Sequence, residues 1–157
     1  MSIVINGTNG EITPLATFTG TTSQVGISLV SGLEKVTVSA TAATGTINYD
    51  VTTQSNLYYT ANAAANWTIN FRASSGTSMN TMMAVGDSTT VVHMVTNGGS
   101  AYYNNAVQVD GSSVTPEYQG GTAFSAGNAN SIDVYVYVLI KTADATFKVL
   151  ASQTQFT

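Results

Sequence analysis

The stretch Ile132-Asp-Val-Tyr-Val-Tyr-Val-Leu-Ile140 decides the fold class of this chain. β-Branched residues recur at every second position, and side chains two residues apart on a strand share one face. The pattern predicts a central β-strand whose core face is formed by Ile132, Val134, Val136, Val138 and Ile140. The opposite face is predicted to be amphipathic and carries Asp133, Tyr135, Tyr137 and Leu139.

The same alternation recurs along most of the chain. Residues 67–72 place Trp67, Ile69 and Phe71 on one face, and residues 46–51 have a similar pattern. Residues 35–39 precede the latter across a short loop at 42–45, which favours a hairpin. Further strands are predicted at residues 88–96, 101–109 and 146–153, with weaker patterns at 25–30, 56–60 and 114–118.

The connections between these segments are rich in glycine and asparagine, which supply the positive φ angles of tight turns. Asp110-Gly111 is one such turn signal. Helical patterns are nearly absent, apart from one predicted helical turn at residues 78–84, where methionines are spaced as on one helix face. Many short alternating strands predict an all-β fold, a single antiparallel β-sandwich or jelly-roll-like domain.

The first 25 residues differ from the rest. They are rich in threonine and glycine and have too little apolar content to fold alone. Residues 1–25 are therefore interpreted as an extended docking arm, with residues 26–157 as the sandwich domain. Its apolar anchors are Ile3, Val4, Ile5 and Ile12. Such an arm is exchanged between subunits or docks on another protein. The alternative is a first strand of the same domain followed by a long loop.

Charged residues make up only 8% of the chain, against about a quarter of an ordinary globular domain. The four basic residues are dispersed and the net charge is −4, which argues against nucleic-acid binding. The chain has no cysteine, which excludes disulfides and thiolate chemistry. No segment has the roughly 20 apolar residues needed to span a bilayer, and no signal peptide is visible. We therefore expect synthesis in a reducing cytoplasm and no membrane partner.

Candidate catalytic groups are few. His93 is the only histidine and falls on the same strand face as Val91 and Val95, so it is interpreted as a packed or interface residue. No Gly-x-Ser-x-Gly elbow occurs, and the acidic residues are too scattered to form a calcium loop. The sequence predicts no catalytic residue, no cofactor and no metal site, and hence no enzyme.

Tyrosines are the most suggestive candidates for binding. They occur as the pairs Tyr58-Tyr59 and Tyr102-Tyr103, and in alternation at Tyr135 and Tyr137. Adjacent residues on a strand point to opposite faces, so each pair is predicted to place one ring outward. Four rings are candidates for packing on a partner subunit or stacking on a glycan: Tyr58, Tyr102, Tyr135 and Tyr137. Packing in the core is the alternative role.

Two parts of the chain resemble known proteins. Residues 2–10, with Ile12 and Pro14, resemble the N-terminal segments of many bacteriophage tail and fibre proteins. The second resemblance covers residues 55–157 and rests on the motifs Asn66-Trp-Thr-Ile-Asn-Phe-Arg72, Tyr102-Tyr-Asn-Asn105, Tyr118-Gln-Gly-Gly121 and Ser131-Ile-Asp-Val-Tyr-Val-Tyr137. This part resembles β-rich virion structural proteins of tailed phages, especially marine and cyanobacterial ones.

The resemblance implies a virion component without catalytic residues, of a kind that is often trimeric. The short chain favours a capsid decoration, head-fibre or adaptor subunit over a long fibre. We therefore expect a non-enzymatic structural protein that is made in the host cytoplasm and resides in the virion. It would attach to other virion proteins through its arm and associate with its own copies, as a homotrimer, through sheet faces. The alternative is a carbohydrate-binding, host-recognition module that contacts host-surface glycans.

Overall fold

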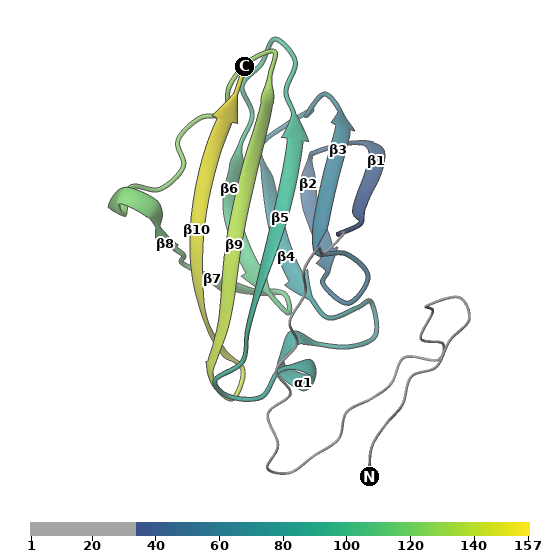
Figure 1. Ribbon diagram of the computed structural model, residues 1–157. Helices are drawn as coiled ribbons and strands as arrows, with labels where there is room; N and C mark the ends of the chain where they lie inside the picture. The colour runs from purple at the N-terminus through teal and green to yellow at the C-terminus, as the bar shows by residue number, and fades with distance from the viewer. Residues whose placement is uncertain (1–33) are drawn as a thin grey trace, which may run out of the picture. The chain divides into compact units, whose positions relative to one another are not determined.

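The computed structural model describes residues 34–157, and the chain divides into two units, residues 1–32 and 33–157. The second unit is built from two β-sheets that face each other (Figure 1). The large sheet has the strand order β1-β3-β5-β9-β10-β8, with bounds Val36–Ala42, Asn56–Ala61, Ser88–Thr96, Ile132–Ala143, Thr146–Phe156 and Glu117–Tyr118. The small sheet has the order β2-β4-β6-β7, with bounds Gly45–Asp50, Trp67–Arg72, Asn104–Val109 and Ser112–Val114. The prediction of an all-β chain is confirmed.

From β1 to β6 the chain alternates between the two sheets, one strand in each. Successive strands of one sheet therefore run in the same direction. The pairs β1–β3, β3–β5, β2–β4 and β4–β6 are all parallel, as is β8–β10. Only β5–β9, β9–β10 and β6–β7 are antiparallel among the described strands. The expectation of an antiparallel sandwich was wrong, because most of the described strand pairs are parallel.

The loop at 42–45 explains this difference. It does not close a hairpin, because β1 and β2 lie in different sheets. Ala43 is fully buried at the corner, and its carbonyl oxygen accepts a hydrogen bond from the amide of Ala64, 2.9 Å away. Gly45 follows with a φ of 59°, in the left-handed region that favours glycine. The chain thus arches over the core instead of folding back on the same sheet.

The structure also reverses the predicted faces of β9. Tyr135, Tyr137 and Leu139 are fully buried between the sheets, whereas the β-branched residues of the same strand point outward and are half-buried. Aromatic rings fill the space of about 10 Å between packed sheets better than valines do. The ring of Tyr137 packs on Phe71 with centroids 5.0 Å apart, and that of Tyr135 packs on Trp67 at 5.5 Å.

Several local predictions are confirmed. Residues 67–72 and 88–96 are strands with the predicted bounds, and Trp67 and Ile69 point inward. Residues 101–109 and 146–153 hold the strands β6 and β10, and residues 56–60 lie in β3. The weak pattern at 114–118 corresponds to the end of β7 and to β8. Asp110-Gly111 forms the turn between β6 and β7, with φ values of 52° and 80°.

The predicted helical turn is also present, as the helix α1, Met79–Met82. Its first backbone amides, at Met79 and Asn80, donate to the carboxylate of Asp110 over 2.7 and 3.0 Å. At its other end, Nζ of Lys141 donates to the carbonyl oxygens of Asn80 and Met83. A turn too short to be stable alone is thus fixed by two side chains, one from the β6–β7 turn and one from β9.

The predicted arm, residues 1–25 with Ile3, Val4, Ile5 and Ile12, lies outside the described residues. The same holds for the weak strand pattern at residues 25–30.

Candidate interaction surfaces

The outer face of the large sheet is mostly apolar. Hydrogen-bonded partners continue it from strand to strand: Val36 pairs with Asn56, Asn56 with Val92, and Val92 with Val136. A parallel row joins Val38, Tyr58, Met94 and Val134. We call this surface the aliphatic face. Its apolar members are Val36 and Val38 on β1, Tyr58 on β3, Val92 and Met94 on β5, Ile132, Val134, Val136, Val138 and Ile140 on β9, and Leu150 and Phe156 on β10.

The aliphatic face is accessible to water. Val38 is 64% exposed, Phe156 54% and Leu150 41%, and the valines of β9 are half-buried. Beside β8 the face is hollowed by a groove of about 290 Å³ lined by Val136, Val138 and Leu150. Contiguous apolar surface of this extent is uncommon on monomeric proteins and marks sites of association.

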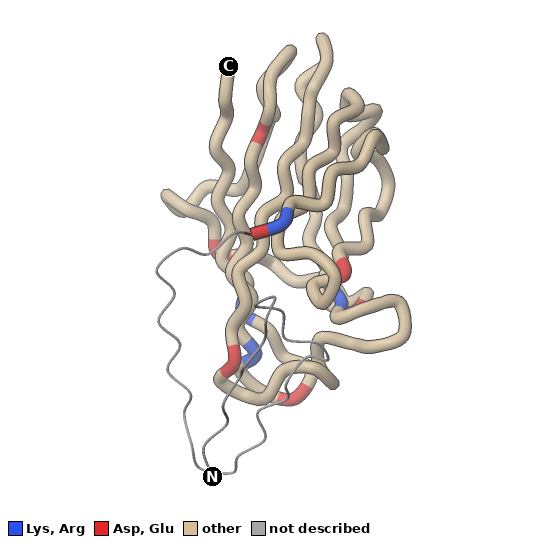
Figure 2. The backbone as a smooth tube through the Cα atoms, turned by 45° about the vertical axis from the view of Figure 1, so that its right-hand side comes forward, with Lys and Arg blue, Asp and Glu red and all other residues tan. Residues whose placement is uncertain are grey.

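Charge is nearly absent from this face. In the strands β1, β3, β5, β9 and β10, Lys148 is the only charged side chain that points outward. Its Nζ lies 2.7 Å from Oε1 of Glu117 on the neighbouring strand β8, so the charge is paired. Figure 2 shows how much of the strand length carries no charged residue. Covering the aliphatic face would therefore desolvate few charges.

The outer face of the small sheet has the opposite character, and we call it the polar face. Paired residues of β2 and β4 bond side chain to side chain: Nδ2 of Asn70 donates to Oδ1 of Asn48 over 2.8 Å, and Arg72 forms an ion pair with Asp50. Gln108 of β6 continues the row beside Asn70. Water solvates such a face well, so the outer faces of the two sheets formed by residues 34–157 differ in character.

The four candidate tyrosines differ in how far they are buried. Tyr58 lies on the aliphatic face, where its hydroxyl accepts a hydrogen bond from Oγ1 of Thr96 over 3.2 Å. Tyr102 is half-buried and packs against the core. Tyr135 and Tyr137 are fully buried, so neither ring presents a stacking surface to a glycan or a partner. This corrects the expectation for those two residues, and its cause is the reversed orientation of β9.

His93 is packed, as the sequence predicted. Its ring is fully buried and meets Tyr59, Trp67 and Tyr49 edge to face, with centroids 5.2, 6.0 and 6.4 Å away. Neither ring nitrogen has a hydrogen-bond partner among residues 34–157. Burial lowers the pKa of the imidazole to about 3, so the ring is neutral at physiological pH. Within the same residues, no three His, Cys, Asp or Glu side chains gather to hold a metal ion.

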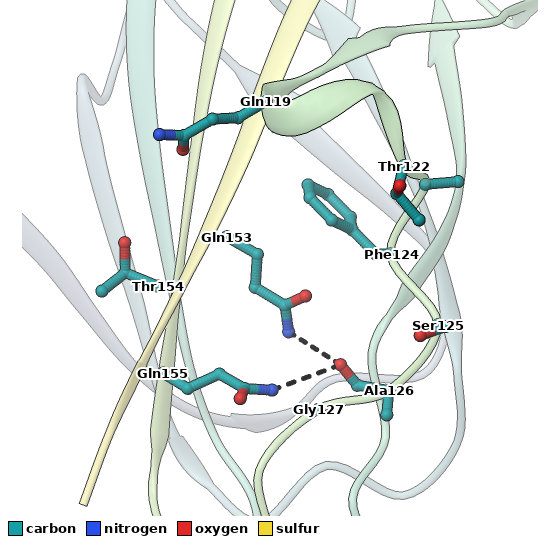
Figure 3. Close-up of a pocket in the computed structure, with 10 residues that line it drawn as sticks. Gln119, Thr122, Phe124, Ser125, Ala126, Gly127, Gln153, Thr154 and Gln155 are labelled. Atoms are coloured by element: carbon teal, nitrogen blue, oxygen red, sulfur yellow. Dashed lines mark hydrogen bonds between the residues drawn. The ribbon is translucent and has the colours of Figure 1, made fainter.

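A second surface feature is a groove of about 860 Å³ beside β10, which we call the β10 groove (Figure 3). One wall is β10 itself, and the other is the segment that follows β8. The two meet because β8 pairs in parallel with β10, Glu117 opposite Leu150. The lining residues are Gln119, Thr122, Ala123, Phe124, Ser125, Ala126, Gly127, Gln153, Thr154 and Gln155. All of them are uncharged.

Hydrogen bonds from glutamine amides of β10 hold the second wall of the β10 groove, the segment that follows β8, against the strand. Nε2 of Gln153 donates to the carbonyl oxygen of Ala126 over 3.0 Å and to the hydroxyl of Tyr135 over 3.1 Å. Gln155 donates to the same carbonyl over 3.4 Å. These contacts hold the loop against the strand, so the walls of the groove are fixed by the fold.

Sequence reasoning missed both surfaces. The valines of β9 were assigned to the core, which concealed the aliphatic face. One feature of the sequence did point to the correct orientation of β9. The chain has side-chain amides that can form hydrogen bonds with the polar groups of Asp133, Tyr135 and Tyr137 when these are buried; they belong to Asn97, Asn104 and Gln153. The β10 groove had no local signal, since its walls are about 30 residues apart in the chain.

Comparison with known proteins adds no relative: no family model, no curated protein and no solved structure matches this chain. In the part of the chain that the structure describes, no helix is long and apolar enough to cross a membrane.

Proposed function

We propose that this chain is a non-enzymatic structural subunit of a bacteriophage particle that associates with copies of itself through the aliphatic face. The observation that carries the proposal is the contrast between the two outer faces. The face of the large sheet is aliphatic and almost uncharged, whereas that of the small sheet is polar. A subunit that worked as a monomer would gain nothing from leaving a row of valine, isoleucine, leucine and methionine side chains on one outer face.

The size of the aliphatic face suits a stable interface. Five strands spaced by about 4.8 Å, with nine positions of about 3.3 Å each along β5, give on the order of 600 Å² per copy. A standard interface buries about 800 Å² on each partner, and side-chain relief adds to the flat area of a sheet. Burial of valine, leucine and methionine side chains supplies the driving force.

A second copy of this chain is the partner whose surface best matches the aliphatic face. The face has one outward charge, already paired with Glu117, so two such faces meet without a mismatch of charge. The proposed assembly is a trimer in which β5 and β9 lie toward the threefold axis, because these two strands form the centre of the aliphatic face. The phage context, as decoration, head-fibre or adaptor subunit, comes from the resemblance of residues 2–14 and 55–157. Residues 1–25 are proposed to dock the subunit on other virion proteins.

Analytical ultracentrifugation of the full chain tests self-association. The wild type is expected to sediment as a trimer, and Val136→Glu as a monomer at the same concentration, because a carboxylate would be buried without a partner. Asn48→Glu is the matched control, since it adds the same charge to the polar face and should leave the trimer intact. A monomeric wild type, or an assembly that Val136→Glu does not weaken, refutes the interface. A dimer that Val136→Glu dissociates retains the interface but refutes the threefold arrangement.

Incorporation into particles tests the role of the arm. The full chain and a variant lacking residues 1–25 are produced in infected host cells, and the purified particles are analysed for the protein. The truncated chain is expected to fold and to be absent from particles. Normal incorporation of the truncated chain would refute the docking role of the arm.

A further inference from the structure

The β10 groove combines the groups that recognise a hydroxyl-rich, uncharged ligand. Its lining includes three glutamine amides, two threonine hydroxyls, one serine hydroxyl and one aromatic ring. Its volume of about 860 Å³ lies within the range of ligand-binding clefts. Because no lining residue is charged, nothing in the groove would pair with a phosphate, a carboxylate or a cation.

Phe124 provides an apolar platform inside this polar groove. Figure 3 shows its side chain projecting from the loop toward β10, between Gln119 and Gln153. The ring is half-buried and packs edge to face with the rings of Tyr118 and Tyr135, with centroids 4.9 and 5.4 Å away. An aromatic face carries partial negative charge and attracts the polarised C–H groups of a sugar ring. Since the ring is already fixed, little conformational entropy would be lost on stacking.

The amides provide acceptors beside that platform. Gln153 and Gln155 use Nε2 to bond the carbonyl of Ala126, and their Oε1 atoms accept no hydrogen bond from residues 34–157. Both side chains are oriented by these bonds, so their oxygens are presented at fixed positions. A ligand hydroxyl that donates to one of these Oε1 atoms takes the place of a water molecule. A ligand that lacks this hydroxyl would leave the Oε1 atom without a hydrogen-bond donor and would bind more weakly.

From this combination we propose that the β10 groove binds an uncharged saccharide, with Phe124 stacking on a sugar ring and Gln153 and Gln155 accepting from its hydroxyls. This proposal does not rest on the proposed assembly. The β10 groove shares Gln119 with the groove beside β8, and its Thr154 pairs with Val134, but none of the apolar residues of the aliphatic face lines it.

The experiment uses the labelled full chain on an array of neutral and anionic oligosaccharides, followed by NMR titration with the best neutral ligand. Binding is expected for at least one neutral oligosaccharide, with shifts of the side-chain amide signals of Gln153 and Gln155. Phe124→Ala should weaken the affinity at least tenfold, whereas Phe124→Tyr, which keeps the ring, should retain it. Gln155→Ala should weaken binding severalfold without touching the core, because Gln155 is exposed.

Asn48→Ala on the polar face is the control and should leave the affinity unchanged, and the unfolding temperature of each variant shows that it is folded. Three results would overturn the proposal: no neutral oligosaccharide binds, only anionic ones bind, or a neutral ligand binds with an affinity that Phe124→Ala and Gln155→Ala do not change. None of these results bears on the trimer, which sedimentation measures separately.

Discussion

The hydroxyl of Tyr137 on β9 donates a hydrogen bond to Oδ1 of Asn104 on β6, 3.0 Å away, and so joins the two sheets through the core. Both residues are buried, and Nδ2 of Asn104 donates to the carbonyl oxygens of Trp67 and Ala106 at 2.9 and 2.8 Å. Burial raises the pKa of Tyr137 well above its ordinary value, so the hydroxyl keeps its proton and remains a donor at neutral pH. This bond explains how a tyrosine face can serve as a core face.

Tyr137→Phe should therefore destabilise the protein although it removes a single oxygen atom. The variant leaves Oδ1 of Asn104 buried without its donor, which costs about 1–3 kcal/mol of unfolding free energy. Urea unfolding followed by tryptophan fluorescence measures the loss. Tyr58→Phe is the matched control: its hydroxyl lies on the outer face, so a change within about 0.5 kcal/mol is expected. Equal losses in the two variants would contradict the role assigned to the buried bond.

His93 should make stability depend on pH below neutrality. Its folded-state pKa of about 3 lies below the value of about 6.5 expected in the unfolded chain, so the unfolded chain binds the proton more readily. The stabilisation is complete above pH 6.5 and is lost as the pH falls toward 3, by about 1.4 kcal/mol per pH unit.

His93→Leu should remove this contribution while leaving no unpaired ring nitrogen in the core. Unfolding free energies of both proteins at pH 7, 6, 5 and 4 are the measurement, and the difference between the two curves isolates His93 from the carboxylates. The wild type is expected to lose stability relative to the variant at each step. Parallel curves would show that the imidazole is not buried in its neutral form.

Sequence periodicity located strands well because alternation is a local property. Residues 67–72 and 88–96 were predicted with the observed bounds, since each carries a clear apolar face against a polar or weaker one. The pairing direction was not predictable in this way. A short loop such as 42–45 can close a hairpin or arch between sheets, and the choice depends on where β3 and β4 lie.

The orientation of β9 shows why the candidate surface was missed. Both faces of residues 132–140 are apolar enough for a core, so the strand alone does not decide between them. The small sheet determines which face is buried. Trp67 and Phe71 pack against the two tyrosine rings, and Oδ1 of Asn104 accepts a hydrogen bond from the hydroxyl of Tyr137. Those partners are distant in sequence. The valine and isoleucine side chains, which have no such partners across the core, lie on the outer face of the sheet.

Gly127 should tolerate no side chain. A Cβ atom there would collide with the carbonyl oxygen of Tyr102 and would lie 2.6 Å from Oδ2 of Asp133 and 2.7 Å from Nδ2 of Asn97. Gly127→Ala should therefore displace this wall of the β10 groove and cost about 1–3 kcal/mol. Gly99→Ala is the control, because its Cβ would meet no atom within 4 Å. Thermal unfolding of both variants checks the prediction, and equal midpoints would contradict the close packing at Gly127.

Asp133 should affect stability in the direction opposite to His93. Burial raises the pKa of its carboxyl group, while hydrogen bonds from Asn128, Gln153 and Asn97 to Oδ2 work against that rise. Oδ1 has no partner among residues 34–157. The folded-state pKa is above the unfolded value, so stability is fully present below pH 4 and is lost as the pH rises through the folded-state pKa.

Asp133→Asn replaces the carboxyl group with an amide, which cannot ionise but keeps one oxygen that can accept these hydrogen bonds. The variant should gain stability relative to the wild type as the pH is raised from 4 to 7, which the difference in unfolding temperature at the two pH values measures. If that difference is unchanged, the carboxylate is ionised in the folded protein without cost. The His93 contribution changes in the opposite direction over the same range, so the two single variants should show pH-dependent differences of opposite sign. Tyr135 pairs with His93 and is hydrogen-bonded beside Asp133, so the departure of the double variant with His93→Leu from the sum of the two differences measures the coupling between the sites.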